Sequence, residues 1–316
     1  MTTYNILSLD GGGIRGVLTA AILERLEADC PGFMSKVDLI AGTSTGGILT
    51  LGMASGLTPT QAREMYEKSG AAVFGGHLGP RLLANLPRLD QWVEADYDDR
   101  PLKELLLQQF GSLTLGDLKK SVLVTSFALD NQYTGNPQRQ WKPKIFNNLD
   151  QDEDRREKVV DVALRTSAAP TYFPVYQGFV DGGVVANNPT MCAVAQALSQ
   201  GPSGGKQTED SLRVLSVGTG VNLKYIEVKN EIESWGYVQW APHLISLILD
   251  GSVDLVNYQC RQILGDKYLR LNPVVYQPIS LDDVNQIATL KKIAQDIDPD
   301  IWRQAVAWVK QNFMAA

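Results

Sequence analysis

The sequence predicts a three-layer α/β/α sandwich with a mainly parallel central sheet. Short apolar runs typical of buried strands alternate along the chain with helical patterns, and glycine-rich turns join the two. Strands separated by helices in this way favour a parallel sheet with helices on both faces. The 316 residues are 44% hydrophobic and 20% charged, a composition that supports a sizeable core and excludes a disordered chain or a coiled coil.

The first two predicted strands each end in a turn that opens a helix. Residues Tyr4–Leu9 form a β-type run that ends at Asp10-Gly11-Gly12-Gly13. The helix predicted after it has apolar side chains on one face, at Ile14, Val17, Leu18, Ile22 and Leu26. A second strand is predicted over Val37–Ala41, and a turn leads from it into a helix over about Thr45–Ala54.

Two further buried strands are predicted later in the chain. Nearly every residue of Ser121–Leu129 is apolar or small, which indicates a strand covered on both faces, and Leu212–Val217 has the same character. The polar stretch Ser199–Ser211 is the most linker-like part, but the strand after it is as apolar as the earlier ones. We therefore interpret this stretch as a surface loop and expect residues 1–316 to form a single domain.

The charge balance disfavours several kinds of partner. Lysine and arginine number 29 and aspartate and glutamate 35, which gives a net charge of −6. Because the chain has no basic run, we do not expect it to bind a nucleic-acid polymer. An anionic membrane would not attract it electrostatically either, so lipid contact has to rely on local apolar surface.

Cysteine usage and the first residues predict a soluble, cytoplasmic protein. Cys30, Cys192 and Cys260 are far apart and form no metal-ligand pair, a pattern that suits a reducing compartment. The start, Met1–Asn5, has no basic segment before an apolar one, so no secretory signal is expected. No run approaches the roughly 18 apolar residues that a membrane span needs.

The strongest local motif is Gly42-Thr43-Ser44-Thr45-Gly46, which directly follows a predicted strand and precedes a helix. In a nucleophile elbow the serine lies on a strained turn of this kind. Small residues two positions away on either side relieve the crowding, and the helix N-terminus favours negative charge. The motif therefore predicts a catalytic serine at Ser44, and an ordinary tight turn is the alternative.

A second motif, Asp10-Gly11-Gly12-Gly13-Ile14-Arg15-Gly16, also follows a strand and opens a helix. Three successive glycines leave backbone N–H groups uncovered at the helix N-terminus, which makes an anion site. The anion is either a nucleotide phosphate or the oxyanion of an acyl-transfer transition state. A dinucleotide site calls for an acidic residue at the end of the next strand. Glu24 and Glu27 fall on the first helix instead, which weakens the nucleotide interpretation.

The chain offers few candidates for the base that would activate a serine. Its two histidines, His77 and His243, lie in a flexible glycine loop and at a helix start, and neither ends a strand as a triad histidine usually would. Asp181-Gly182-Gly183 places a carboxylate at the end of an apolar segment. Partial burial would raise the pKa of this carboxyl group, and direct contact with the serine hydroxyl would remove the need for an intermediary.

Taken in order, DGGGIRG, GTSTG and DGG resemble the patatin-like phospholipase family. Supporting stretches are Ala168–Pro174, Asn187–Pro189, Asp250–Gln262 and Tyr268–Asn272. The resemblance covers about Tyr4 to Asn272, and beyond it we expect a helical C-terminal extension over about 282–316. The family fold is itself a three-layer α/β/α sandwich.

The resemblance implies a role for individual residues. Ser44 would be the nucleophile and Asp181 its partner in a Ser–Asp dyad. Gly11, Gly12 and Gly13 would supply amides to an oxyanion hole, with Arg15 helping to hold that loop. The remaining glycines of the three motifs support these turns: Gly16, Gly42, Gly46, Gly182 and Gly183. Thr45 and Gly183 replace an alanine found in many members, a small change in each case. Neither a metal nor a cofactor is expected.

The resemblance implies a lipid acyl hydrolase of the phospholipase A type, which acts on phospholipids or other acyl lipids at a membrane surface. Some bacterial members are effectors switched on by cyclic nucleotides, and the resemblance permits such an activator here, although no motif establishes it. The alternative function is a nucleotide- or phosphate-binding module that uses the glycine loop without hydrolysis. Lipid head group, chain length and oligomeric state lie beyond the sequence.

Two segments are candidates for lipid contact. Phe74–Trp92 combines apolar residues with glycines and prolines, and either caps an acyl groove, touches a bilayer or packs on the sheet as an insertion. Trp235, Tyr237 and Trp240 precede the apolar run Leu244–Leu249. For this run we favour core packing of an amphipathic helix over an interfacial role.

Overall fold

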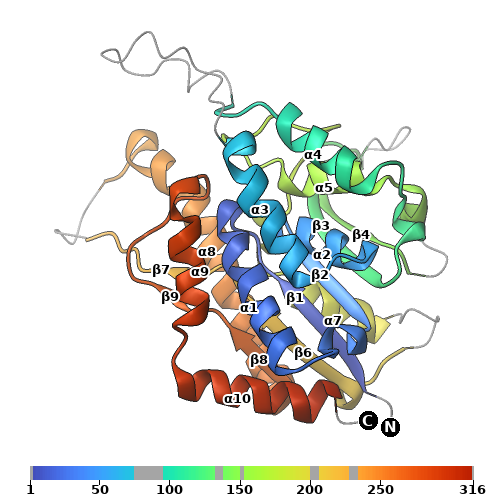
Figure 1. Cartoon of the computed structure of the whole chain (residues 1–316). Coiled ribbons are helices and arrows are strands. Elements are labelled where there is room, and N and C mark those ends of the chain that lie inside the picture. Colours follow the sequence, from blue (N-terminus) through green and yellow to red (C-terminus); the bar gives the residue numbers. More distant parts are fainter. Residues whose placement is uncertain are drawn as a thin grey trace.

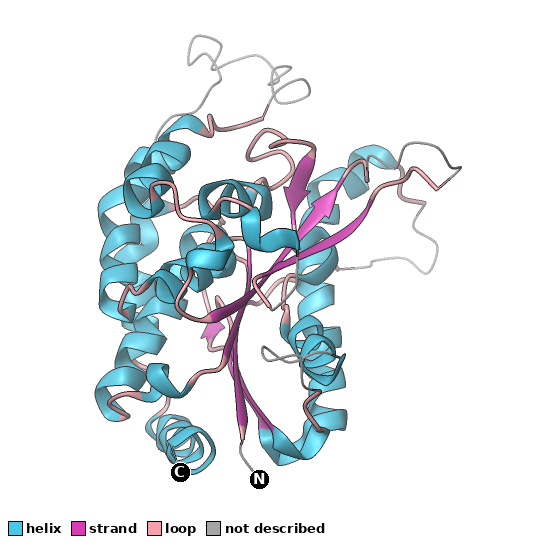
Figure 2. Ribbon diagram, turned by 90° about the vertical axis from the view of Figure 1, so that its right-hand side faces the viewer, coloured by secondary structure: helices cyan, strands magenta, loops and turns pink. Residues whose placement is uncertain are grey.

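A mixed sheet of seven strands is covered by helices on both faces (Figures 1 and 2). The computed structural model describes residues 3–74, 95–131, 138–149, 153–199, 206–227 and 234–314. The seven strands are β1 Tyr4–Leu9, β2 Leu39–Thr43, β3 Ser121–Ala128, β4 Lys142–Asn147, β5 Phe179–Asp181, β6 Leu212–Val217 and β8 Tyr268–Leu271. This is the predicted sandwich.

The strand order is β4-β3-β2-β1-β6-β8, and β5 also pairs with β3. The pairs β1–β2, β2–β3, β1–β6 and β6–β8 are parallel, whereas β4 and β5 run antiparallel to β3. A second, two-stranded sheet joins β7 (Val221–Asn222) to β9 (Val274–Val275). The chain adds β2 and β3 on one side of β1, and later adds β6 and β8 on the other side. In α/β proteins, ligands bind where the strand order changes side in this way, outside the carboxyl ends of the strands.

The two faces of the sheet follow from the alternation of side chains along each strand. Leu7 and Leu9 of β1 join the hydrophobic cluster under α1 (Gly16–Asp29), while Tyr4 and Ile6 join the cluster on the opposite face. Figure 2 shows the helices on both sides of the strands. The other helices are α2 Thr45–Ser55, α3 Pro59–Phe74, α4 Arg100–Phe110, α5 Val159–Ser167, α6 Gly183–Ala186, α7 Thr190–Ser199, α8 Tyr237–Leu264, α9 Ile287–Gln295 and α10 Pro299–Val309.

The last two helices, α9 and α10, lie where a helical extension was expected. Leu290 of α9 and Trp302 of α10 are buried in the same cluster as α1. The Trp302 indole N–H donates to Asp29 at 2.7 Å, and the Arg25 guanidinium lies 3.9 Å from the centre of the Trp302 rings. The C-terminal helices therefore cover the outside of α1 and seal part of the core.

The strands predicted over Tyr4–Leu9 and Leu212–Val217 are confirmed by β1 and β6. The second strand starts two residues later than predicted, at Leu39. The Val37 amide donates back to Met34 and so closes a short 3₁₀ turn before the strand can begin. Within the described ranges, no helix is both long enough and apolar enough to cross a membrane.

One interpretation of an apolar run is wrong. The run Leu244–Leu249 does not pack as core: Leu244, Leu247 and Ile248 are exposed on α8, and only Ile245 and Leu249 turn toward a pocket. Consecutive apolar residues in a helix point to different sides of it, and the sequence does not show which of these sides another element covers. Most of the Phe74–Trp92 segment lies outside the described residues, although Phe74 ends α3 and lines the same pocket.

Candidate active site

The carboxyl ends of the parallel strands bring the two glycine motifs together. Leu9 at the end of β1 is in register with Gly42 of β2, so the loop that begins at Asp10 lies beside the turn at Ser44. The antiparallel strand β5 pairs Asp181 with Ser126 near the end of β3. Three segments far apart in the sequence thus meet at one edge of the sheet.

Ser44 lies on a sharp turn between β2 and α2. Its φ of 54° and ψ of −123° place it in a conformation that non-glycine residues rarely adopt, as a nucleophile elbow requires. A Cβ atom at Gly42 would overlap the Gly46 carbonyl group, and one at Gly46 would overlap the carbonyl group of Leu9. The G-x-S-x-G spacing therefore reflects close backbone approach on both sides of the serine.

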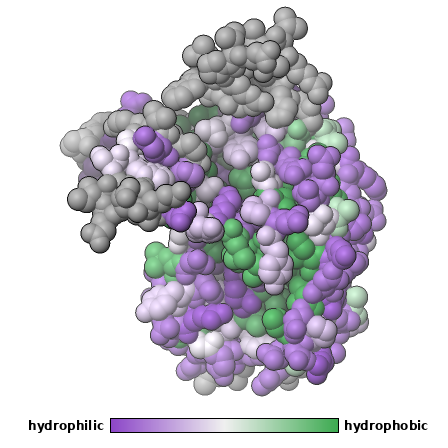
Figure 3. Space-filling model, turned by 90° about the vertical axis from the view of Figure 1, so that its left-hand side faces the viewer, coloured by the Kyte–Doolittle hydropathy of each residue, from purple (hydrophilic) through white to green (hydrophobic). Residues whose placement is uncertain are grey.

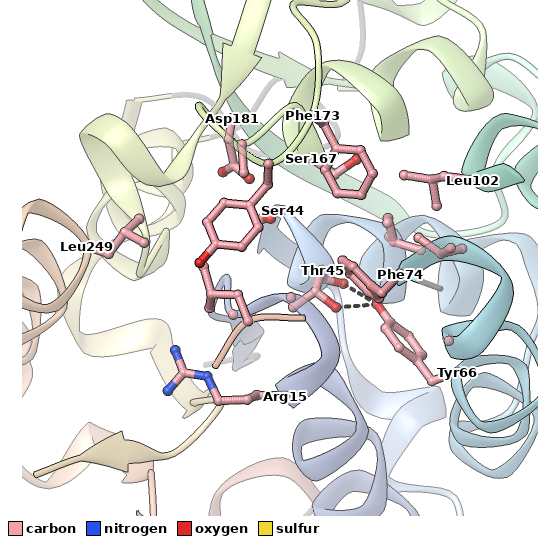
Figure 4. A pocket seen from close by; sticks show the side chains of 18 of the residues that line it. Arg15, Ser44, Thr45, Tyr66, Phe74, Leu102, Ser167, Phe173, Asp181 and Leu249 are labelled. Carbon is pink, nitrogen blue, oxygen red and sulfur yellow. Dashed lines mark hydrogen bonds between the residues drawn. The ribbon is translucent and has the colours of Figure 1, made fainter. Parts of the chain in front are cut away.

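Asp181 is buried beside Ser44, and both residues line the same end of the pocket (Figure 4). The Gly183 amide donates to the Asp181 carboxylate at 2.7 Å. Burial raises the pKa of Asp181 to about 6, against the opposing effects of the Ser44 side chain and the Gly183 amide, which both lower it. A carboxylate with this pKa is ionised at neutral pH and is more basic than an ordinary aspartate.

The end of α5 holds both residues in place. The Thr166 hydroxyl accepts the Ser44 amide at 2.8 Å and donates to the Thr125 carbonyl at 2.6 Å. The Thr166 carbonyl accepts the Gly182 amide at 3.3 Å, and the Ala168 carbonyl accepts the Asp181 amide at 2.9 Å. Sequence reasoning missed Thr166, since the two partners of its hydroxyl group lie 122 and 41 residues earlier in the chain.

The glycine loop of the first motif is anchored at one end and open at the other. The Gly11 amide donates to the Asn187 carbonyl at 3.0 Å, and Thr219 donates to the Gly11 carbonyl at 2.9 Å. Gly12 and Gly13 line the pocket, and the described residues offer no backbone acceptor for their amides. The Gly11 amide therefore holds the loop in place, and the amides of Gly12 and Gly13 are the ones that can donate to an anion.

Two buried arginines fix the same loop. Arg15 lines the pocket and donates to the Gly220 carbonyl at 3.3 Å, and burial lowers the pKa of its guanidinium group (Figure 4). Asp10, which precedes the glycines, forms a two-point ion pair with Arg270 of β8, and Arg270 also donates to Ser216 at 2.7 Å. Sequence reasoning gave Arg270 no role, because its contact with Asp10 spans 260 residues.

The remaining motif glycines are sites of close approach. A Cβ at Gly16 would overlap the Thr45 hydroxyl, which is itself hydrogen-bonded to Tyr66 of α3 (Figure 4). At Gly182 a Cβ would overlap the Thr125 carbonyl, and at Gly183 it would overlap a side chain of α8. The motif glycines thus pack the turns of the site against neighbouring elements.

The walls of the pocket beyond Ser44 are apolar. They come from α2, α3, α4, α6 and α8 and from loops, and include Ile48, Val73, Phe74, Leu102, Tyr172, Phe173, Val184, Ile245 and Leu249. A pocket of this kind, with a few polar groups at one end, suits a hydrocarbon chain that carries a polar terminus. In the described ranges, no three histidine, cysteine or carboxylate side chains lie close enough to hold a metal ion.

His243 is not part of this arrangement. The His243 ring lies in α8, 5.9 Å from the ring of Trp235, and is not among the residues that line the pocket. His77 lies outside the described residues.

A strained serine, a neighbouring carboxylate, free loop amides and an apolar pocket are the parts of a serine hydrolase that works on acyl chains. Comparison with known proteins makes the class specific, because the patatin-like phospholipase model matches residues 7–194, a range that includes all three motifs. The chain belongs to the patatin-like phospholipase family. This membership makes it a lipid acyl hydrolase and argues against a nucleotide-binding module.

Several relatives are phospholipases by name. The chain is 35% identical to the cGAMP-activated phospholipase of Pseudomonas aeruginosa (strain BWHPSA011 / Pa011) over 277 residues, 85% of this chain and 78% of that protein. It is 35% identical to the cGAMP-activated phospholipase of Vibrio cholerae over 68% of this chain and 63% of that one. It is 30% identical to the 85/88 kDa calcium-independent phospholipase A2 of Rattus norvegicus over 89% of this chain and 37% of that protein.

Proposed function

We propose that Ser44 and Asp181 form a catalytic dyad that hydrolyses the carboxylic esters of phospholipids or other acyl lipids without a histidine. The observation that carries the proposal is the position of the buried Asp181 carboxylate beside Ser44, whose side chain lowers the pKa of that carboxyl group. Direct contact lets the carboxylate accept the hydroxyl proton without an intermediary.

In the first half of the reaction, Ser44 Oγ attacks the ester carbonyl carbon while its proton passes to Asp181. Negative charge develops on the former carbonyl oxygen, where the Gly12 and Gly13 amides donate to it. The C–O bond to the leaving alcohol then breaks, and the protonated Asp181 returns its proton to that oxygen. The products of this half are an acyl-enzyme and a lysolipid or alcohol.

In the second half, a water molecule attacks the acyl-enzyme and gives its proton to Asp181. Collapse of the second tetrahedral intermediate breaks the bond to Ser44 Oγ, which recovers the proton, and the fatty acid leaves. A pKa of about 6 lets Asp181 act both as a base and as an acid near neutral pH. The ionised carboxylate can accept a proton from Ser44 or water, and the protonated group can donate it to the leaving oxygen.

The apolar pocket supports an acyl chain as the part of the substrate that is bound. Its walls extend from Ser44 past Ile48 and Phe173, so a chain that enters with its ester at Ser44 would lie against hydrocarbon. Burial of each methylene stabilises such a complex by about 0.8 kcal/mol. We propose that specificity resides in the acyl chain more than in the head group.

The test is hydrolysis of p-nitrophenyl acyl esters by three purified variants. Ser44→Ala and Asp181→Asn should each lose at least about a thousandfold in turnover. Ser167→Ala is the matched control: Ser167 lines the same pocket, but its hydroxyl donates to Ala163 of its own helix. That control should stay within about tenfold of the original protein. Near-normal turnover in Ser44→Ala would refute the proposal.

We also propose a cyclic dinucleotide as the activator. The support is similarity, since two relatives at 35% identity are cGAMP-activated phospholipases by name. Ester hydrolysis should rise when cGAMP is added and stay unchanged with an equimolar mixture of AMP and GMP. Equal rates with and without cGAMP would remove this regulator. We further propose that residues 1–316 act as one domain, because α9 and α10 share their hydrophobic cluster with α1.

A further inference from the structure

The long helix α8 is apolar on two opposite faces. On the inner face, Ile245 and Leu249 line the pocket, and Cys260 is buried against the sheet. On the outer face, Leu247 and Ile248 are each 47% exposed. A soluble helix normally has one apolar face and one polar face, and a helix that is apolar all round is normally covered all round.

The exposed apolar residues form one continuous stripe. At 100° per residue, seven positions fall within an arc of about 100° and extend over about 27 Å of the helix. We call these residues the α8 stripe: Trp240, Leu244, Leu247, Ile248, Gly251, Leu255 and Tyr258. Leu255 is 58% exposed and Tyr258 62% exposed, and none of the seven is charged.

Such a stripe is unusual for a surface without a partner. Scattered single hydrophobic residues are normal on a protein surface, but a contiguous apolar patch marks a binding surface. On the side of the molecule in Figure 3, hydrophobic residues also gather in one area with hydrophilic residues around it. Because the residues of the stripe lie on one side of α8 along its length, they form one extended surface that can bind a flat partner.

We propose that the α8 stripe docks the protein on the surface of an electrically neutral lipid bilayer, an inference that rests on the proposed function. Because Ile245 and Leu249 line the catalytic pocket, α8 is the wall between that pocket and the stripe. A helix is about 10 Å across, so a bilayer on the stripe lies within one helix diameter of the pocket. The surface that holds the substrate would then be continuous with the site that consumes it.

The composition of the stripe fits a bilayer interface. Its ends are Trp240 and Tyr258, and between them lie leucine and isoleucine side chains and Gly251. Tryptophan and tyrosine prefer the level of the lipid head groups, where an apolar ring and a polar edge are both accommodated. A helix that lies in the interface buries its apolar face at the boundary between head groups and acyl chains.

Charge decides which bilayer fits. The charged side chains of α8 are Asp250, Asp254 and Arg261, and Lys224 donates to Ser246 of the same helix, so no excess of basic groups lies beside the stripe. Without such an excess, and with a net charge of −6 on the chain, anionic lipids offer no electrostatic gain, so the stripe is suited to zwitterionic head groups such as phosphatidylcholine.

A second copy of the chain is a poorer fit. A strip about 27 Å long and about 10 Å wide covers roughly 300 Å². Stable dimers bury about 800 Å² on each partner. A bilayer has no such minimum, because apolar side chains enter it one by one and each contributes its own burial.

The experiment compares vesicle binding by three proteins, all in a Ser44→Ala background so that the lipid stays intact. The stripe variant carries Leu247→Gln and Ile248→Gln, which remove apolar surface while keeping a good helix-forming residue. The control carries Ile301→Gln, on the exposed face of α10. Co-sedimentation with phosphatidylcholine vesicles measures binding, and light scattering measures the oligomeric state.

We expect the stripe variant to partition at least about tenfold more weakly than the parent, with the Ile301→Gln control unchanged. With Ser44 restored, the stripe variant should hydrolyse a soluble p-nitrophenyl butyrate normally yet hydrolyse vesicle phospholipid at a reduced rate. Equal vesicle binding by parent and stripe variant, or no binding by the parent, would overturn the proposal. So would a parent dimer that the stripe substitutions dissociate. Failure of the catalytic proposal would instead appear as absent butyrate hydrolysis, whatever the vesicles bind.

Discussion

Replacing Asp181 with asparagine should abolish ester hydrolysis and, at neutral pH, make the protein more stable. Burial raises the pKa of this carboxyl group from 3.8 to about 6, so the folded protein binds the proton more tightly than the unfolded chain does. At 1.36 kcal/mol per pKa unit, ionisation of Asp181 costs the folded state about 3 kcal/mol. Asparagine keeps the shape of the protonated side chain without this cost.

The sign of the pH dependence follows from the raised pKa. The stability that comes from protonated Asp181 is fully present below pH 3.8 and is lost as the pH rises through about 6. The asparagine side chain of the variant does not titrate, so the difference in unfolding free energy between variant and parent should grow across this window. Roughly half of the 3 kcal/mol falls between about pH 5 and about pH 7.5, a range convenient for measurement.

The assay is urea unfolding of parent and Asp181→Asn at several pH values across this range. Comparing the two proteins at each pH cancels the titration of all other groups, and the change in their difference isolates Asp181. Any constant offset reflects the different hydrogen bonds of an amide and an acid, which do not vary with pH. A difference that stays flat from about pH 5 to about pH 7.5 would refute the claim that this carboxylate is desolvated.

Substitutions at four further positions test the rest of the proposed mechanism. Thr166→Val leaves the Ser44 amide buried without its acceptor and should lower kcat by about tenfold to a hundredfold with little change in KM, while Thr166→Ser should restore it. In Gly12→Ala the added Cβ would overlap the Thr219 side chain and displace the loop amide. Turnover should therefore fall by about 10² to 10³ with little change in KM, because an oxyanion donor acts on charge that develops in the transition state. His77→Ala and His243→Ala, singly and together, should keep activity within about tenfold, and a thousandfold loss in steady-state assays would indicate a triad instead.

The sequence predicted those parts of the fold that depend on a short stretch of chain, such as an apolar run or a glycine-rich turn. Strands β1 and β6 were predictable because four of the six residues in each are apolar and lie in one short run, as in a strand covered on both faces. Strands β4 and β5 were not predicted. The first residues of β4 are exposed lysine and proline, and β5 has only three residues, so both depend on pairing with β3.

The residues of the candidate site also fall into those that short motifs predict and those that depend on distant contacts. Ser44, Asp181 and the glycine loop could be named from motifs, because each depends on a short stretch of chain. Thr166 and Arg270 could not, since their roles come from contacts with segments that are distant in sequence and become neighbours only at the edge of the sheet. The outward face of α8 was misjudged for a related reason: a periodic pattern does not reveal which of two apolar faces has a partner.

The most direct test of the central claim is the rate at which a fluorophosphonate labels Ser44 as a function of pH. If Asp181 alone activates the serine, the labelling rate of the parent should rise through a single ionisation near pH 6 and then level off. In Asp181→Asn, labelling should be slower by at least about a thousandfold, and this rise should be gone. A parent-like profile in Asp181→Asn, with the adduct still mapped to Ser44, would contradict the Ser–Asp dyad.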